Sequence, residues 1–493
     1  MNHLTLIAAL LMPVVIDGVV AADASNRKPN FLLTQAILEK GQSSDRSDIK
    51  RLVKKAEKAR ESGSYQMASE AWEQILLIVD SSPKPDDLLK ATVLNNLGIL
   101  YSHQGLYNKA KQKHLRSLDI KERILGHNHL DTAKSLSALG NAYSKLGQYD
   151  KAEPVLLRSL SIREQSLGPD HLDIADGLND LGVLYTRIGN YKKAEPLFQN
   201  VLAIREKSLG PNDSETAKIL NHLATIYKEQ GLYSKAEPLL IRALEICRSL
   251  DRDEKPLGPK ALDTARILNS LGSLYFRQGF WEHSEYLYLT AQLIRQNVLG
   301  AEHLFTLITT NNLALVYMEQ GLYGKAEPLL RSVLENSKKA MTPDLIVSLN
   351  NLALYYLDQG DYDKAESLYI EALDLCRRML GPGHPRGYAV QKNLSVLYVL
   401  TADYMKAATF LSAPIRAQLL FIQQEVPYLL ASERETLIEI ESLRGGFERA
   451  FSGIMYDNSF TDLTMLSRLN RQGLLEEIEK RQAQLASLPG PQQ

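Results

Sequence analysis

Histidine and cysteine are the side chains in this sequence best suited to metal binding, acid–base catalysis or redox chemistry. Four histidines share one local context, since each stands three residues after the glycine of a Leu-Gly pair: His129, His171, His303 and His384. The ligands of one metal ion must all lie within about 2.3 Å of it. Copies of one repeated position are spaced too widely for that. We therefore interpret these histidines as structural and predict no metal centre, although His222, outside this set, lies beside a predicted groove.

The two cysteines, Cys247 and Cys376, also occupy equivalent positions in distant segments. A disulfide requires Cα atoms within about 7 Å, so we predict that they are small buried hydrophobic residues that do not pair with each other. The sequence contains no metalloprotease, serine hydrolase, phosphate-loop or dinucleotide motif at a junction between a strand and a helix. These observations predict that the chain is not an enzyme and uses no cofactor.

Overall charge gives no reason to expect a nucleic-acid partner. Lysine and arginine number 57 against 58 aspartates and glutamates, and a balanced chain produces no field that would gather a polyanion. Hydrophobic residues make up 44% and charged residues 23% of the sequence, which is the composition of a folded domain.

The elements that carry these residues form a repeat of 42 residues. Leu94, Leu136, Leu178 and Leu220 stand 42 residues apart in matching segments. Later copies have spacings of 48, 42, 39 and 42, because one loop gains six residues and another loses three. These copies are marked by Leu268, Thr310, Leu349 and Gln391, and Leu52 opens a weaker first copy. The sequence thus predicts about nine repeats.

Each repeat is predicted to be a pair of helices. Leu94, Leu97, Gly98 and Tyr101 recur at i, i+3, i+4 and i+7, which is one face of an α-helix. No segment shows the two-residue alternation of strands, which excludes a propeller. A glycine then ends each first helix: Gly105, Gly147, Gly189, Gly231, Gly279, Gly321 and Gly360.

The start of each second helix is predicted from a capping box followed by a proline. Asp150-Lys151-Ala152-Glu153 is typical of a capping box. The prolines that follow are expected in the opening turn, where amides lack intrahelical partners; they are Pro154, Pro196, Pro238 and Pro328.

Leucine, glycine or alanine, tyrosine, glycine, tyrosine and alanine at these offsets resemble the tetratricopeptide repeat, and the 42-residue length is similar to kinesin light chains and many bacterial proteins. The resemblance covers residues 49–409. It implies an all-α, right-handed superhelical solenoid of antiparallel helix pairs with a C-terminal helical annex. It also implies a protein-binding scaffold or adaptor, without catalysis of its own, that holds an extended peptide or protein partner in a concave groove.

The predicted groove residues stand just beside the core stripe of the first helices. They are Asn95, Asn179, Asn221, Asn269, Asn311 and Asn350, and one turn earlier Lys134, Lys218 and Arg266. Asp176 interrupts the cations, and Ile308 and Val347 replace them in later copies. Asparagine can donate to and accept from a peptide backbone, and the resemblance implies acidic or carboxylate-ended peptides. The alternative is that the asparagines shape helix ends and the cations are solvated surface.

The N-terminal region differs from the repeats. Residues 1–22 resemble an export signal, since Leu4 to Val20 is almost uncharged and ends at Val20-Ala21-Ala22, although no lysine or arginine precedes it. They predict an exported protein, periplasmic or extracellular, with a cytoplasmic location as the alternative. Residues 23–48 are predicted to be a linker or capping segment. No later segment approaches the roughly 20 apolar residues of a spanning helix, so an integral membrane protein is not expected.

Residues 410–487 keep a helical pattern without the repeat and are expected to cover the last repeat, and 488–493 resemble the start of a linker. Residues 410–493 resemble the helical segment that precedes caspase-like CHAT peptidase domains in cyanobacterial repeat proteins. This implies an alternative function as the regulatory or substrate-recruiting part of a peptidase system whose catalytic domain is absent from this chain. A small-ligand sensor is a third interpretation. The partner and the oligomeric state stay open.

Overall fold

The computed structural model describes residues 43–410, except 62–63, 83–85, 252–260, 341–342, 382–383, 404 and 408. All regular secondary structure in this part of the chain is α-helical, which confirms the predicted fold class. The helices are α3 (Ser43–Glu61), α4 (Tyr65–Ser81), α5 (Asp87–His103), α6 (Tyr107–Leu125), α7 (Leu130–Lys145), α8 (Tyr149–Ser166), α9 (Leu172–Ile188), α10 (Tyr191–Leu209), α11 (Ser214–Glu229), α12 (Tyr233–Asp251), α13 (Ala261–Arg277), α14 (Trp281–Leu299), α15 (Leu304–Glu319), α16 (Tyr323–Ala340), α17 (Asp344–Asp358), α18 (Tyr362–Met379) and α19 (Pro385–Leu400).

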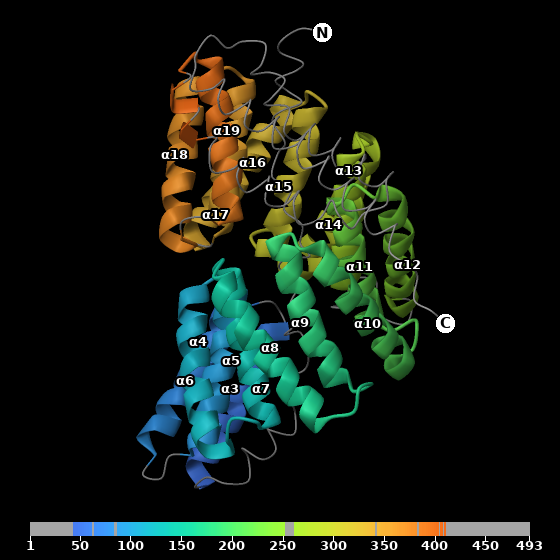
Figure 1. The fold of residues 1–493 in the computed structure, drawn as a ribbon. Coiled ribbons are helices and arrows are strands. Elements are labelled where there is room, and N and C mark those ends of the chain that lie inside the picture. The colour runs from blue at the N-terminus through green and yellow to red at the C-terminus, as the bar shows by residue number, and fades with distance from the viewer. Residues whose placement is uncertain are drawn as a thin grey trace, which may run out of the picture.

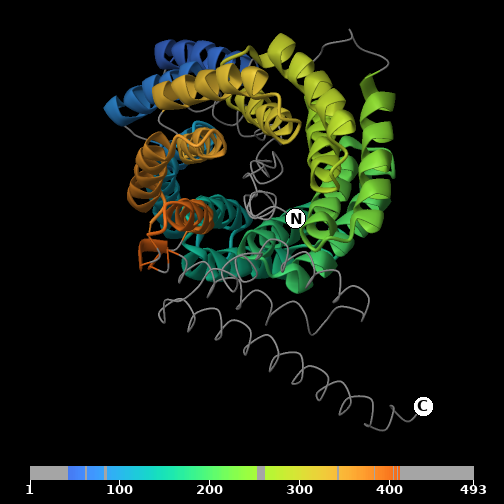
Figure 2. The same ribbon diagram turned by 90° about the horizontal axis from the view of Figure 1, so that it is seen from above.

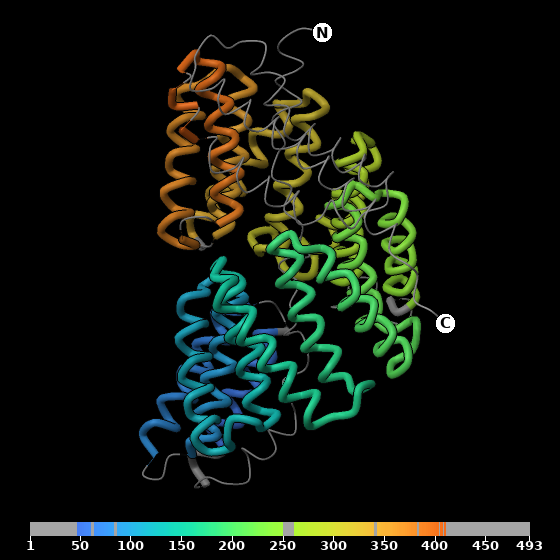
Figure 3. The backbone as a smooth tube through the Cα atoms, in the orientation of Figure 1, coloured from blue at the N-terminus to red at the C-terminus, as the bar shows by residue number. Residues whose placement is uncertain are grey.

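Each odd-numbered helix packs against the even-numbered helix that follows it, and each pair packs on the next. The pairs build a right-handed superhelix (Figure 1) that circles a central axis (Figure 2). The tube in Figure 3 shows the chain rising from α3 to α19, and both views place α17 to α19 over the early repeats. Within the described residues eight helix pairs are complete, and α19 opens a ninth.

The odd-numbered helices form the inner layer of the superhelix. Successive odd helices contact each other directly at α5–α7, α7–α9, α11–α13, α13–α15, α15–α17 and α17–α19. The exposed large apolar side chains lie mostly on even helices, for example Leu157 on α8 and Ile241 on α12. Because inner helices lie on the smaller radius, they are the ones that approach their counterparts in the next repeat. The concave face is therefore built from the first helix of each repeat.

Small residues on the inner helices make room for large residues on the outer ones. A Cβ atom added to Gly182 on α9 would lie 2.8 Å from the Phe198 ring of α10. Gly98 meets His114, and Gly272 meets Tyr288, in the same way. The glycine in the repeat motif thus lets two helices cross closely enough for a buried ring to fill the gap.

A tyrosine near the end of several inner helices connects the helix to the preceding repeat. Tyr185 donates to Glu153 at 2.6 Å, and Tyr227 donates to Glu195 at 2.6 Å. The same bond recurs at Tyr275 and Tyr398. The glutamate of the repeated Ala-Glu pair is therefore a hydrogen-bond acceptor for the next repeat.

The second helices begin where the sequence predicts to within two residues, but the capping box predicted at Asp150 is wrong. These helices begin three residues before the Ala-Glu pair, at Tyr149 and its counterparts, so Asp150 is helical and no capping box starts there. Where a side chain caps the helix it belongs to the preceding residue, as when Asn190 accepts from the Lys193 amide. The left-handed turn at Gly189, with φ 83°, places Asn190 at that position.

The prolines consequently lie inside the helices rather than in their opening turn. Pro154 is the sixth residue of α8 and is helical. At that position proline removes the hydrogen bond to the carbonyl of Asp150, a loss that the sequence reasoning had not included. All four prolines are exposed on the outer layer.

Several predicted segments fall wholly or largely outside the described residues. These are the export signal at 1–22, the linker at 23–48 except for the start of α3 at Ser43, the helical region at 410–487 except Phe410, and the linker at 488–493. The peptidase-associated resemblance rests on the same C-terminal segment. Among the helices that are described, none has the length and apolar character needed to cross a membrane.

Candidate peptide-binding face

The predicted asparagines lie on successive inner helices, from α5 to α17, with α7 as the exception. Five of them are at most 5% exposed: Asn179, Asn221, Asn269, Asn311 and Asn350. Asn95 is half-buried and lies 3.0 Å from a ring nitrogen of His114. The asparagines therefore lie on the inner helices, as predicted. Their side chains are much more buried than those of solvated surface residues.

In the C-terminal half, asparagines from neighbouring repeats bond to one another. Asn393 donates to Asn350, Asn350 donates to Asn351, and Asn351 donates to Asn311, each at 3.1 Å. These bonds cross from α19 to α17 and from α17 to α15. Part of the asparagine row thus joins the inner helices, a role distinct from both interpretations drawn from the sequence.

In the central repeats each asparagine keeps one buried polar atom without a partner in the described protein. The atoms are Asn179 Oδ1, Asn221 Oδ1, Asn269 Nδ2 and Asn311 Nδ2. Leaving such a group unsatisfied costs about 1–3 kcal/mol. Asn179 and Asn221 therefore offer an unused acceptor, whereas Asn269 and Asn311, whose oxygens accept from Thr309 and Asn351, offer an unused donor. Four successive inner helices, α9 to α15, therefore carry unused hydrogen-bonding capacity.

The predicted cations are held in ion pairs on their own helices. Lys218 lies 2.6 Å from Glu215, Arg266 lies 2.7 Å from Asp263, and Lys134 lies 3.1 Å from Asp131. The Lys218 and Arg266 side chains are each only 16% exposed. A carboxylate ligand would have to compete with these acids, so the cations form a paired rather than a free positive surface.

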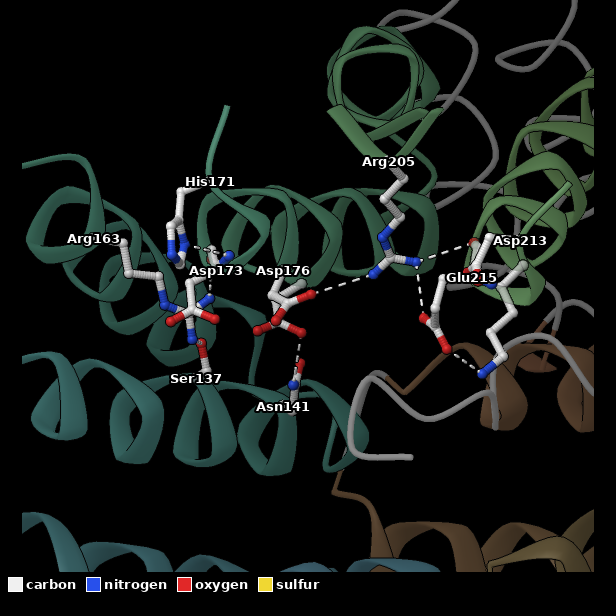
Figure 4. Close-up of polar contacts among 11 residues, drawn as sticks. Ser137, Asn141, Arg163, His171, Asp173, Asp176, Arg205, Asp213 and Glu215 are labelled. Carbon is white, nitrogen blue, oxygen red and sulfur yellow. Dashed lines mark hydrogen bonds and ion pairs between the residues drawn. The ribbon is translucent and has the colours of Figure 1, made fainter. Parts of the chain in front are cut away.

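The acidic interruption at Asp176 is also neutralised. Arg205 reaches from α10 to Asp176 on α9 at 3.3 Å and to Glu215 on α11 at 3.0 Å (Figure 4). The Arg205 side chain is 6% exposed. Sequence reasoning missed this residue because it comes from the outer helix of the preceding repeat.

Arg205 is one of a row of buried cations at the same position of the outer helices. Each donates to the backbone carbonyl ten residues further on, in the first turn of the next inner helix: Lys121 to Asp131 at 3.3 Å, Arg163 to Asp173 at 2.8 Å, Arg205 to Glu215 at 3.1 Å and Arg295 to Phe305 at 2.8 Å. The recurrence of a cation every 42 residues was a signal that the sequence contained. This row connects one repeat to the next.

Both cysteines occupy this same position in other repeats. Cys247 and Cys376 are buried, and neither forms a disulfide. Burial raises the pKa of the Cys376 thiol. A buried neutral thiol fits the prediction that they are small hydrophobic residues.

His222, on α11, lies flat against Phe198, with ring centroids 5.0 Å apart. Burial, together with the nearby Arg266, Arg205 and Lys218, lowers its pKa to about 3. The imidazole is therefore neutral at physiological pH. It acts as a packing surface beside the asparagine row and not as a cationic ligand group.

The four equivalent histidines are helix N-caps. The Nδ1 atoms of His129, His171, His303 and His384 accept the backbone N–H two residues on, at 3.0 to 3.2 Å. Asp213 takes the same role before α11. Accepting at Nδ1 requires the neutral ring with its proton on Nε2. No cluster of three or more potential metal ligands occurs in the described residues.

Comparison with known families agrees with this geometry. A tetratricopeptide repeat model matches residues 52–123, 100–165, 131–207, 173–249 and 263–339, and a second matches 345–386. The chain belongs to the tetratricopeptide repeat family. Among curated proteins no relative matches the sequence.

Solved structures similar to this tetratricopeptide repeat chain include kinesin-light-chain-like proteins. BtubC (BKLC) from P. vanneervenii is 25% identical over 48% of this chain and 92% of its own, with a TM-score of 0.38. A putative kinesin light chain from P. anserina is 23% identical over 43% of this chain and 98% of its own, with a TM-score of 0.35. A Rap protein complexed with competence and sporulation factor is 14% identical, covers 77% of this chain and 100% of its own, and has a TM-score of 0.51. The Rap likeness shows a shared helical-solenoid fold.

Proposed function

We propose that this chain is a noncatalytic scaffold or adaptor that binds an extended peptide segment along its inner layer. Tetratricopeptide repeats are protein-binding modules, and the row of inner-face asparagines supplies groups that recognise a peptide backbone irrespective of sequence. The single observation that carries the proposal is the set of unsatisfied amide atoms on Asn179, Asn221, Asn269 and Asn311; because these atoms are buried, peptide binding must move neighbouring inner-layer side chains aside to reach them.

The spacing of the row fits an extended chain. Packed helices lie about 8–10 Å apart, and an extended peptide rises about 3.3 Å per residue. Every third residue of such a peptide can therefore bring a backbone group to the next asparagine. Four asparagines on α9 to α15 would engage about ten residues.

The ends of the row differ in character, which gives the ligand a direction. Around α11 and α13 the inner face carries Lys218 and Arg266 with their acidic partners, whereas Ile308 and Val347 on α15 and α17 are buried apolar residues. We propose a peptide with a carboxylate near α11 to α13 and an apolar side chain near α15 to α17. The carboxylate would exchange places with Glu215 or Asp263.

The proposal is tested with a panel of fluorescein-labelled decapeptides of acidic, neutral and basic composition, measured by fluorescence anisotropy. For a peptide that binds, Asn221→Ala and Asn269→Ala should each raise the Kd about threefold to tenfold, the effect of losing one hydrogen bond of roughly 0.5–1.5 kcal/mol. Asn200→Ala is the control, because Asn200 is exposed on the outer helix α10. It should leave the Kd unchanged.

Two results would count against the proposal. If no peptide of the panel binds, or if the Asn221 and Asn269 variants bind like the Asn200 control, the inner row is not the binding face. The acidic preference is tested separately with Lys218→Ala. Equal loss of affinity for acidic and neutral peptides in that variant would remove the carboxylate from the proposal and leave the backbone recognition in place.

A further inference from the structure

The four histidine N-caps are equivalent in sequence, but they lie in different surroundings. His129 and His171, which cap α7 and α9, are exposed. His303 and His384, which cap α15 and α19, are partly buried. The difference comes from the superhelix, because the later repeats lie over the earlier ones (Figures 1 and 2).

The first contact between the turns joins the starts of α4 and α15. Tyr65 stacks on His103 with ring centroids 4.5 Å apart and an interplanar angle of 13°. The same tyrosine ring lies 6.0 Å from the ring of His303. Tyr65 and His303 are 238 residues apart in the chain, so this small aromatic cluster spans six repeats.

The second contact joins the loop before α8 to the start of α19. A Cβ atom built on Gly147 would lie 2.6 Å from Cδ2 of His384, and its three nearest neighbours would all be atoms of that imidazole. The glycine backbone therefore lies directly against the ring. Gly147 and His384 are 237 residues apart, which again is six repeats.

Charged and phenolic groups surround the second contact. Burial raises the pKa of Tyr149, two residues after Gly147, while Arg187 of the lower turn and Arg386 of the upper turn both lower it. Arg386 also pairs with Asp344 at 2.9 Å. Groups from both turns thus share one partly buried environment. At the intervening repeat, α17 begins after Pro343, which offers no side-chain acceptor or aromatic ring.

We propose that His303 and His384 lock successive turns of the superhelix together, at Tyr65 and Gly147, and so fix its pitch. Each imidazole uses Nδ1 to cap its own helix and its ring to contact the turn below. Since the inner helices of both turns surround one axis, the lock also sets the distance between the inner helices of one turn and those of the next. If the proposed peptide binding is correct, the lock would link ligand occupancy to the shape of the superhelix, but the lock itself requires no ligand.

The lock is tested by inserting a wedge at Gly147. Gly147→Asn should force the turns apart, because the side chain must occupy the space of the His384 ring, while asparagine tolerates the left-handed backbone. Gly321→Asn is a matched control: its φ is 72° against 70° for Gly147, and a Cβ there would meet nothing within 4 Å. Small-angle X-ray scattering of the full chain should show a larger radius of gyration for the first variant only, with equal helical content by circular dichroism.

A second pair of variants keeps the test decisive if Gly147→Asn fails to fold. Asparagine is a good N-cap, so the double variant H303N/H384N retains both caps and removes both rings. H129N/H171N makes the same change at the exposed histidines. The proposal predicts expansion and faster amide exchange at residues 145–150 for the first double variant relative to the second. Equal radii and equal exchange in the two double variants would overturn it.

Discussion

Replacing Gly182 by alanine tests the packing that lets each helix pair close. A Cβ at this position would lie 2.8 Å from Cζ and 2.9 Å from Cε1 of Phe198, whose side chain is completely buried. Because the ring cannot move away without disturbing its own neighbours, overpacking should cost about 1–3 kcal/mol. Alanine regains roughly 0.8–1.0 kcal/mol of helix propensity. The net expectation is a loss of about 1 kcal/mol in the free energy of unfolding.

A matched substitution separates the two contributions. Gly324 is an exposed helical glycine in α16, and a Cβ there would meet nothing within 4 Å. Gly324→Ala should therefore be neutral or stabilising, by up to about 1 kcal/mol. Urea unfolding followed by circular dichroism compares the variants. Amide exchange in α9 and α10 localises the effect, since a repeat array need not unfold in two states.

A compensating substitution completes the test. In two other repeats a buried leucine at the position of Phe198 is paired with an alanine at the position of Gly182, as Ala224 with Leu240 and Ala314 with Leu330. Phe198→Leu should therefore be less harmful in the Gly182→Ala background than alone, with a coupling energy of about 1–2 kcal/mol. If Gly182→Ala is as stable as Gly324→Ala, or if the two substitutions are strictly additive, the steric explanation is wrong.

Two further predictions concern the connections between repeats. Arg163→Met should lower the free energy of unfolding by about 1.5–3 kcal/mol, because the partly buried Asp173 carbonyl loses a charged donor at 2.8 Å; an unchanged urea midpoint would contradict this. Acidification should weaken the lock. In the closed superhelix, burial lowers the pKa of His303 to about 4 and of His384 to about 3, below the ordinary value near 6.5. Contact between the turns is therefore fully favoured above about pH 6.5, and its equilibrium constant falls roughly tenfold per histidine by pH 5.5. The groups that face these two rings are Tyr65, His103 and Arg295 at His303, and Arg187 and Arg386 at His384. Scattering at pH 7.5 and 5.5 should show expansion in the wild type and little change in H303N/H384N, and a pH-independent radius in the wild type would refute it.

The repeat, the helix pairs and the inner position of the asparagine row could be predicted from the sequence, because these features depend on local periodicity that recurs in each copy. The sequence also contains the spacings that predict the ion pairs and the row of buried cations. Lys218 follows Glu215 by three residues, which is the spacing of an ion pair on one helix face. The buried cation represented by Arg205 likewise recurs at a fixed position of several repeats.

The exact start of the second helices was not predictable from the capping-box pattern. Whether Asn190 or Lys192 opens the helix depends on the left-handed turn at Gly189 and on the bond from the Asn190 amide to the Tyr185 carbonyl at 2.8 Å. Several residues on either side satisfy the same compositional rule. Backbone geometry selects among them.

Only the tertiary structure decided which of the equivalent histidines do more than cap a helix. The sequence shows His129 and His303 in the same local context, and both accept one backbone N–H. Their different surroundings arise because a small rotation between neighbouring repeats accumulates until, six repeats later, one turn lies on another. No local sequence pattern specifies this accumulated rotation. The contact between Tyr65 and His303 therefore forms only when the superhelix is assembled.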